Sequence, residues 1–287
     1  MDSSVYEAHG PADFHAAYDR VLAQWPAGTR SGTVATVFGA THVNTCGPAD
    51  GPPLVLLPGG RATAASWYAN AAELARTFRV HAVDLIGDPG RSVPDPSRPL
   101  RTVADLTAWL DAVLDGLGTG PAALAGHSYG GWIALHYALH APGRVTRLAL
   151  LDPTQCFAGF RAGYLLHALP LLLRPSARRI RAFLEWETGG VPPAEWLRLQ
   201  EATAGFPTAR PVTGPRPSAA ALRSLHTRVL LLVAANSRTH DPRQVAARAA
   251  GLLPKVETHL LPDVSHHALP YTNPSATNRR LLEFLSG

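Results

Sequence analysis

The feature that most constrains this chain is the segment Gly126-His127-Ser128-Tyr129-Gly130, which has the pattern G-x-S-x-G. An apolar run at residues 122–125 precedes it, and a helix-like stretch at residues 131–138 follows it. A tight strand-to-helix turn crowds the backbone, and glycines two positions on either side of the serine relieve that crowding. The serine then stands at the carboxyl end of a strand, above the positive end of the next helix. The pattern predicts a nucleophilic Ser128; an inert serine in a glycine-rich turn is the alternative.

Composition fits one large folding unit that carries an insertion. The chain has 287 residues, 46% of them hydrophobic and 16% charged, so a large core is expected. No apolar run approaches the roughly 20 residues that span a bilayer, and residues 1–4 show no secretory signal. Cys46 and Cys156 are too few for a disulfide framework. We therefore expect a cytoplasmic protein with no membrane partner.

The formal charge of +5 is concentrated in one region. Residues 153–222 contain eight arginines against four glutamates. We interpret this excess first as a solvated face, and second as a surface that attracts an anionic substrate or an acidic partner protein. No recognised nucleic-acid motif and no metal-ligand spacing of Cys or His is present, so neither nucleic acid nor metal is expected.

Strand-like and helix-like segments alternate along most of the chain, which predicts a mostly parallel sheet flanked by helices. Residues 153–222 interrupt this alternation with short apolar segments separated by prolines. We therefore expect a core of residues 1–152 and 223–287, and a helical cap or lid of residues 153–222. An ordinary helical subdomain that packs on the core is the alternative interpretation of the insertion.

Several short motifs, in this order and at these distances, resemble the α/β-hydrolases. They are Leu57-Pro58-Gly59-Gly60, Asp84-Leu85-Ile86-Gly87 with Gly90-Arg91-Ser92, the G-x-S-x-G turn, and His267-Ala268-Leu269-Pro270 followed by Asn273-Pro274. The resemblance covers about residues 34–285 apart from the insertion, and it is greatest to small carboxylesterase-like serine hydrolases with a helical cap. It implies the α/β-hydrolase fold with the cap inserted after the strand that ends near Asp152, a catalytic triad, and no cofactor.

The resemblance places the general base in the loop before the last helix, where two histidines are adjacent. The family pattern has a proline seven residues after the base, and counting back from Pro274 gives His267. The run of histidine, two apolar residues and Pro270 also matches the pattern. His266 then occupies the place where the family usually has glycine. We therefore expect His267 to be the base, with His266 as the alternative.

The triad acid departs from the commonest family pattern, which places it after the strand at residues 229–233. The loop there offers only Asp241, which precedes Pro242 and would more naturally cap a helix. A second family arrangement uses the end of the strand that follows the helix at residues 131–138, where Asp152 lies 24 residues after Ser128. Because the carboxyl ends of parallel strands converge, Asp152 can reach a histidine from the last loop. We expect Asp152 to be the acid, with Asp241 as the alternative.

Backbone amides of Gly60 and Tyr129 are the expected donors to the oxyanion. Four aromatic residues are candidates for an apolar acyl pocket, with ordinary core packing as the alternative for each: Trp67, Trp132, Phe157 and Phe160.

These residues predict a serine hydrolase that cleaves a small-molecule ester, thioester or lactone through an acyl-enzyme. The arginine excess of the insertion supports a narrower alternative, a thioesterase or cyclase that takes acyl chains from an acidic carrier protein. The fold also occurs in non-hydrolytic lyases and ligand-binding proteins, which form a third alternative.

Overall fold

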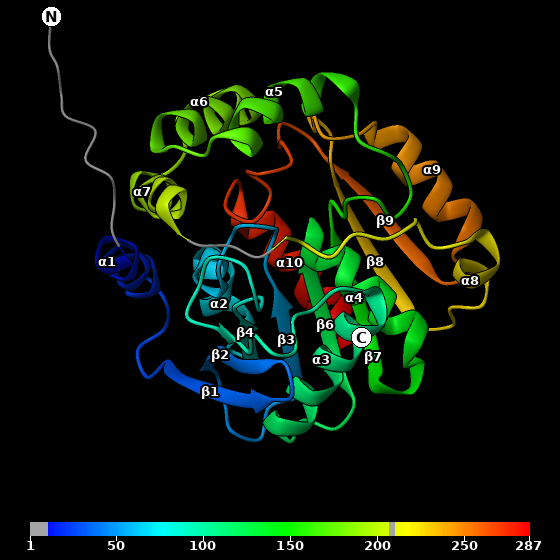
Figure 1. The fold of residues 1–287 in the computed structure, drawn as a ribbon. Helices are drawn as coiled ribbons and strands as arrows, with labels where there is room; N and C mark the ends of the chain where they lie inside the picture. The colour runs from blue at the N-terminus through cyan, green and yellow to red at the C-terminus, as the bar shows by residue number, and fades with distance from the viewer. Residues whose placement is uncertain (1–10, 207–209) are drawn as a thin grey trace, which may run out of the picture.

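The computed structural model describes residues 11–206 and 210–287, so the expectation about residues 1–4 lies outside the described residues. In this part of the chain, nine strands form one sheet in the order β1-β2-β4-β3-β6-β7-β8-β9, and β5 pairs with β2 (Figure 1). The strands are β1 (Arg30–Thr36), β2 (Gly39–Cys46), β3 (Pro53–Leu57), β4 (Arg79–Val83), β5 (Val93–Pro94), β6 (Ala122–His127), β7 (Val145–Leu151), β8 (Arg228–Ala234) and β9 (Val256–Leu261). Neighbours from β4 to β9 in this order are parallel, whereas β2 pairs antiparallel with β1, β4 and β5.

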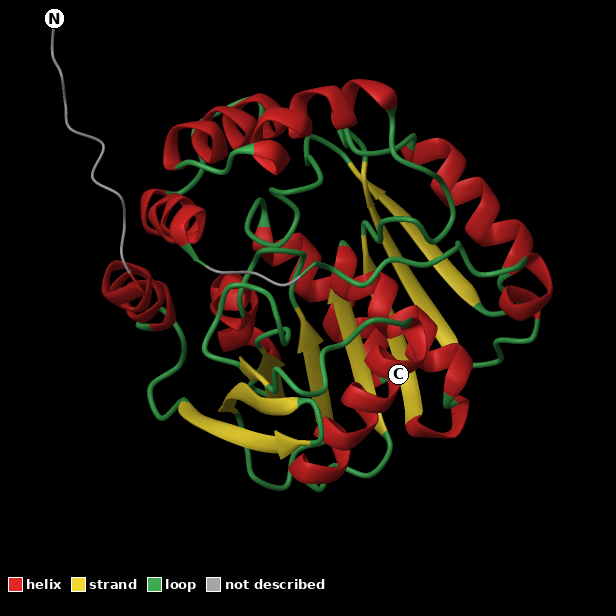
Figure 2. Cartoon of the chain, viewed as in Figure 1, coloured by secondary structure: helices red, strands yellow, loops and turns green. Residues whose placement is uncertain are grey.

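Helices flank the sheet on both faces (Figure 2), which confirms the predicted α/β-hydrolase architecture. They are α1 (Pro11–Leu22), α2 (Tyr68–Leu74), α3 (Val103–Leu117), α4 (Tyr129–His140), α5 (Ala162–Leu173), α6 (Ala177–Thr188), α7 (Ala194–Ala202), α8 (Ala219–Arg223), α9 (Pro242–Leu252) and α10 (Pro274–Ser286), with short 3-10 turns η1 (Ala64–Trp67), η2 (Pro142–Arg144) and η3 (Thr203–Gly205). Among the described residues, none of these helices combines the length and the apolar character that crossing a membrane requires.

The core lies in two layers, one on each face of the sheet. Side chains alternate along β3, so that Val55 and Leu57 pack with α3 and α4, while Leu54 and Leu56 pack with α2 and α10. All four are fully buried. A strand that is covered on both faces must be apolar throughout, which explains why its sequence does not alternate between apolar and polar residues.

Helices α5, α6 and α7 lie together beyond the carboxyl ends of the central strands (Figure 1). They share a small apolar core of their own, in which Ile180, Phe183 and Leu184 of α6 pack against Trp196 of α7. Helix α1 joins this group because its Tyr18 packs in one cluster with residues of α7. Helices α5, α6 and α7 therefore form a layer above the edge of the sheet at which Ser128 lies.

The turn between β6 and α4 is shaped by close backbone contacts. A Cβ atom on Gly130 would come within 3.0 Å of the carbonyl oxygens of Leu57 and Pro58, and a Cβ atom on Gly126 would come equally close to the Gly130 carbonyl. Ser128 itself has φ of 53°, a left-handed conformation that costs a non-glycine residue on the order of 1–3 kcal/mol. The surrounding contacts therefore hold the serine in a conformation that it would not adopt alone.

We predict that Gly130→Ala lowers the free energy of unfolding by about 3 kcal/mol or more, because the methyl group must displace the end of β3. Urea titration followed by circular dichroism measures this change. Gly163→Ala is the matched control. Apart from the neighbouring residues and the backbone of its own helix, no atom lies within 4 Å of the added methyl group, and Gly163 is helical, so its stability should be unchanged or higher by up to about 1 kcal/mol. Equal effects of the two substitutions would contradict the packing argument.

Candidate active site

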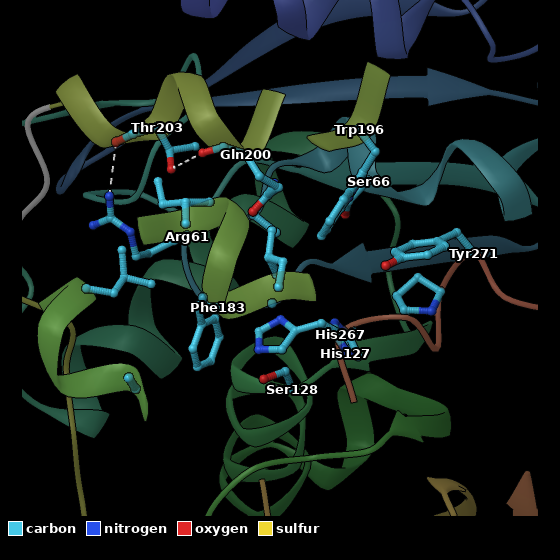
Figure 3. A pocket seen from close by; sticks show the side chains of 18 of the residues that line it. Arg61, Ser66, His127, Ser128, Phe183, Trp196, Gln200, Thr203, His267 and Tyr271 are labelled. Carbon is cyan, nitrogen blue, oxygen red and sulfur yellow. Dashed lines mark hydrogen bonds between the residues drawn. The ribbon is translucent and has the colours of Figure 1, made fainter. Parts of the chain in front are cut away.

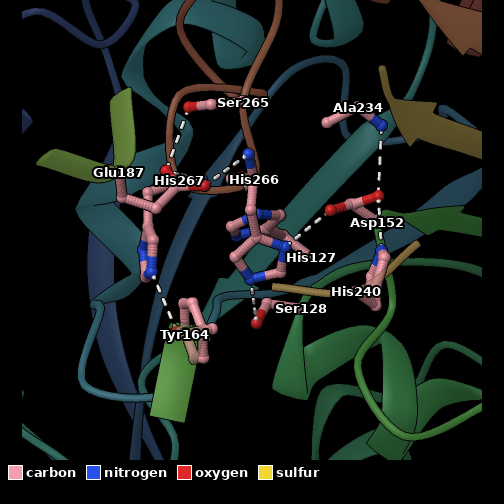
Figure 4. A network of polar contacts seen from close by, with 10 residues as sticks. All are labelled: His127, Ser128, Asp152, Tyr164, Glu187, Ala234, His240, Ser265, His266 and His267. Carbon is pink, nitrogen blue, oxygen red and sulfur yellow. Dashed lines mark hydrogen bonds and ion pairs between the residues drawn. The ribbon is translucent and has the colours of Figure 1, made fainter. Parts of the chain in front are cut away.

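Ser128, His266 and Asp152 form a continuous hydrogen-bonded chain at the carboxyl edge of the sheet (Figure 4). Ser128 follows β6, Asp152 follows β7, and His266 lies in the loop between β9 and α10. His266 Nε2 is 2.8 Å from Ser128 Oγ, and His266 Nδ1 is 2.7 Å from Asp152 Oδ2. Because an ionised carboxylate only accepts hydrogen bonds, Nδ1 carries the ring proton and Nε2 is free to accept the serine proton. This is the arrangement of a nucleophile, a base and an orienting acid.

The imidazole of His267, which the sequence analysis favours as the base, contacts Tyr164, whereas that of His266 contacts Ser128. His267 Nε2 lies 3.3 Å from the Tyr164 hydroxyl, and its ring packs edge-on against Phe183. The rings of His266 and His267 are nearly perpendicular, at an interplanar angle of 85°, because side chains of neighbouring residues project in different directions. The spacing from Pro274 locates the loop that carries the base, but it does not predict which way each side chain of that loop points. The geometry therefore corrects the prediction: His266 occupies the position of the base, and His267 lines the adjoining pocket.

The Asp152 carboxylate is completely buried and fully engaged. Its Oδ1 accepts hydrogen bonds from His240 Nε2 at 3.0 Å and from the Ala234 amide at 3.1 Å, while Oδ2 accepts from His266. Burial alone would raise the pKa of Asp152, but the charge interactions and hydrogen bonds of His240 and His266 outweigh it and hold this pKa well below its usual range. The carboxylate is therefore ionised whenever the enzyme is folded near neutral pH.

His240 is a residue of the site that the sequence analysis does not single out. It lies in the loop after β8, which is the loop where the commonest family pattern places the acid. Here that loop does not supply the acid. It supplies the buried imidazole of His240, which forms a hydrogen bond with Asp152. The absence of a carboxylate at the expected position, with a histidine close by, is the signal that would have identified it.

Asp241, the alternative acid, lies outside this network. Its side chain is exposed, and Oδ1 accepts a hydrogen bond of 3.0 Å from the Gln244 amide at the start of α9. It is a helix N-cap, as its position before Pro242 suggests. The geometry therefore favours Asp152 over Asp241 as the partner of the imidazole.

His127 binds the backbone of His266. Its Nε2 donates a hydrogen bond of 2.9 Å to the carbonyl oxygen of His266. Burial, reinforced by the nearby His266, lowers the pKa of His127 to about 3, so the ring is neutral under ordinary conditions. Its role in this structure is therefore to hold the backbone of the base in place rather than to exchange protons.

Gly60, which the resemblance implies as an oxyanion donor together with Tyr129, lies beside Tyr129, and Gly59 lies beside the nucleophile. A Cβ atom on Gly59 would lie 3.4 Å from the Cβ of Ser128, and one on Gly60 would lie 3.5 Å from that of Tyr129. Tyr129 is the first residue of α4, so its amide has no acceptor within the helix. The amides of Gly60 and Tyr129 are thus in the neighbourhood that an oxyanion formed at Ser128 would occupy.

A pocket of about 150 Å³ opens beside Ser128, between the core and the helical layer (Figure 3). Its wall is mainly apolar and aromatic, and the insertion supplies Tyr164, Ile180, Phe183, Leu184 and Trp196. An engineered cavity of this size in another protein holds benzene. The space therefore suits one compact apolar substituent of a substrate whose reacting carbonyl lies at Ser128.

The four aromatic residues predicted to line the acyl pocket do not line it. Trp67 and Phe157 are at most 1% exposed and pack in the two core layers. Trp132 also belongs to the core, and the exposed Phe160 is stacked on Tyr164. Their nearness in sequence to the nucleophile and to the insertion did not indicate which way each side chain points, so this prediction was wrong.

Comparisons with known proteins identify the family of this chain. Residues 54–280 match the model of the Alpha/beta hydrolase family. The chain is 32% identical to carboxylesterase YbfK of Bacillus subtilis over 96% of this chain and 94% of that protein. The crystal structure of naproxen esterase (carboxylesterase NP) from Bacillus subtilis superposes with a TM-score of 0.88 at 29% identity, covering 96% of this chain and 97% of that one. The fold and the site thus define a hydrolase, and the chain belongs to the α/β-hydrolase family.

The contrast between the two adjacent histidines gives a direct prediction. His266→Ala should lower kcat/KM on an activated ester by about 10⁴-fold or more, because Ser128 loses its base. His267→Ala should lower it by no more than about tenfold, since that ring only lines the pocket. Steady-state kinetics of both purified variants measure the difference. A larger loss in His267→Ala than in His266→Ala would contradict the assignment.

Stability should depend on pH through the buried histidines. Burial lowers the pKa of His127 to about 3, and that of His81, His136 and His267 to about 4, from an ordinary value of 6.5. Below pH 6.5 the unfolded chain therefore binds protons that the native chain does not, so the free energy of unfolding must fall as pH drops from about 7 to 5. The upper limit is about 1.4 kcal/mol per pKa unit for each ring. Urea titrations at pH 7, 6 and 5 test this, and a constant free energy would contradict it.

Proposed function

We propose that this protein is a serine esterase that cleaves small carboxylic esters through an acyl-enzyme. The observation that carries the proposal is the unbroken chain from Ser128 Oγ through His266 to Asp152, with contacts of 2.8 and 2.7 Å, beside an apolar pocket. The carboxylesterase names of similar proteins from Bacillus subtilis support it. Thioesters and lactones offer the same electrophilic carbonyl carbon and belong to the same reaction class.

The reaction follows from the positions of the side chains. Ser128 Oγ attacks the ester carbonyl carbon as its proton passes to His266 Nε2, and the negative charge on the former carbonyl oxygen is stabilised by the amides of Gly60 and Tyr129. Collapse of this intermediate expels the alcohol, which takes the proton from His266, and leaves the acyl group on Ser128. Water then attacks the acyl carbon in the same way, with His266 as its base. The carboxylic acid is released and the Ser128 hydroxyl is restored. Asp152 stabilises the imidazolium in both halves.

The helical insertion, residues 153–222, acts as the cap in this proposal. Its helices α5, α6 and α7 supply the apolar wall of the pocket, while the core supplies the reacting groups. A wall of this kind excludes water from the reacting carbonyl and selects the substituent that fits. The identity of the substrate therefore depends on residues of the insertion more than on the triad.

A small ester is favoured over an acyl group on an acidic carrier protein. Part of the arginine excess in the insertion is neutralised within it, since Arg181 contacts Glu201 and Arg198 contacts Glu195, each at 2.7 Å. A purely ligand-binding role is disfavoured because it gives no reason for a serine hydroxyl aligned with an imidazole. The carboxylesterase names of similar proteins favour hydrolysis over a lyase reaction. We also propose a cytoplasmic location, which the two free, buried cysteines support.

Replacement of the nucleophile tests the proposal. Ser128→Ala should lower kcat on short p-nitrophenyl esters by about 10⁴-fold or more and abolish labelling by a fluorophosphonate probe. The exposed Ser224, just after α8, provides the control, and Ser224→Ala should retain both activities. A Ser128→Ala variant with full turnover, or a wild-type protein that neither turns over esters nor becomes labelled, would overturn the proposed function.

A further inference from the structure

A buried carboxylate of the insertion binds the loop that carries the base. Glu187, near the end of α6, is only 1% exposed. Its Oε1 accepts a hydrogen bond from the His266 amide, and its Oε2 accepts from the Ser265 hydroxyl and the His267 amide, each at 3.0 Å. Figure 4 shows the side chain of Glu187 reaching these groups on the side of His266 away from Asp152. None of the steps of ester hydrolysis described above uses this residue.

The contacts of Glu187 complete a set that holds the base at every polar group. The imidazole of His266 lies between Asp152 and Ser128, its carbonyl accepts from His127, and its amide donates to Glu187. Of these partners only Glu187 belongs to the helical insertion. A shift of α6 away from the core would break three hydrogen bonds to consecutive residues of the base loop.

The chemistry of this contact requires a carboxylate. All three partners are donors, and an ionised carboxylate has acceptor capacity for all of them. An amide in the same place can accept at its oxygen only, and its NH₂ group would face an N–H or O–H donor. A buried donor without an acceptor costs about 1–3 kcal/mol, so the loop would move to avoid it.

We infer that Glu187 is a positioning residue that couples the docking of helix α6 to the alignment of His266 with Ser128. The inference rests on the proposed function, because it concerns the efficiency of the same triad. It assigns the insertion a second role: besides forming the pocket wall, it holds the base in the geometry that removes the serine proton. Turnover therefore depends on the contact between cap and loop, and not on the triad alone.

Glu187→Gln tests this inference. We expect kcat to fall about 10- to 100-fold with KM changed less than about threefold, since the base is displaced while the pocket wall remains. The rate of fluorophosphonate labelling should fall in parallel. The matched control is Glu185→Gln on the same helix, whose partly exposed side chain contacts Arg181 at 3.7 Å; it should behave as wild type. Ser265→Ala, which removes one of the three hydrogen bonds, should show a smaller loss of about two- to fivefold.

Folding is monitored by circular dichroism, and each kcat is referred to the folded fraction. A folded Glu187→Gln variant with the kcat of Glu185→Gln would overturn the inference, as would a loss of kcat that only follows the loss of folded protein. If Glu187→Gln does not fold, Ser265→Ala decides the question, and an unchanged kcat in that variant overturns the inference. Failure of the proposed function is distinguished by a wild-type protein that has no esterase activity and is not labelled.

Discussion

The buried charge of Asp152 is the constraint on which the rest of the site depends. Burying a carboxylate costs free energy unless each of its oxygens accepts hydrogen bonds. Here the donors lie in three different elements, all of which follow the insertion in the sequence. The Ala234 amide ends β8, His240 follows it in the next loop, and His266 comes from the loop after β9. The hydrogen bond from His266 that stabilises the buried carboxylate therefore also holds the base at the edge of the sheet.

Two carboxylates act on the base in different ways. Asp152 binds the imidazole, fixes its tautomer and stabilises its cation, whereas Glu187 binds backbone and hydroxyl donors and fixes the path of the loop. The first comes from the core and the second from the helical insertion. Because both hold the same residue, the catalytic geometry belongs to the assembled core and cap, although the reacting groups themselves all lie on the core.

Some aromatic residues pack in the core of the protein, and others line the pocket beside Ser128. Trp67 and Trp132 are buried in the two layers of the core and stabilise the frame that presents Ser128. Tyr164, Phe183 and Trp196 stand on the insertion and form the pocket wall. A substrate thus meets side chains from the insertion, while the strained turn at the nucleophile packs against the end of β3 and accepts a hydrogen bond from the Thr154 amide.

Sequence alone determined the features that depend on local geometry. The glycines around Ser128 reflect contacts within one turn and with the neighbouring strand, and Asp152 is marked by its place at the end of a strand. The fold could therefore be predicted from the sequence, and so could the positions of the nucleophile and acid that we propose. The tertiary structure alone decided which adjacent histidine faces the serine, which aromatics line the pocket, and that Glu187 and His240 belong to the site. The physical reason is distance along the chain: the loop that carries His266 takes its shape from partners 79 and 139 residues away, and no local pattern records such contacts.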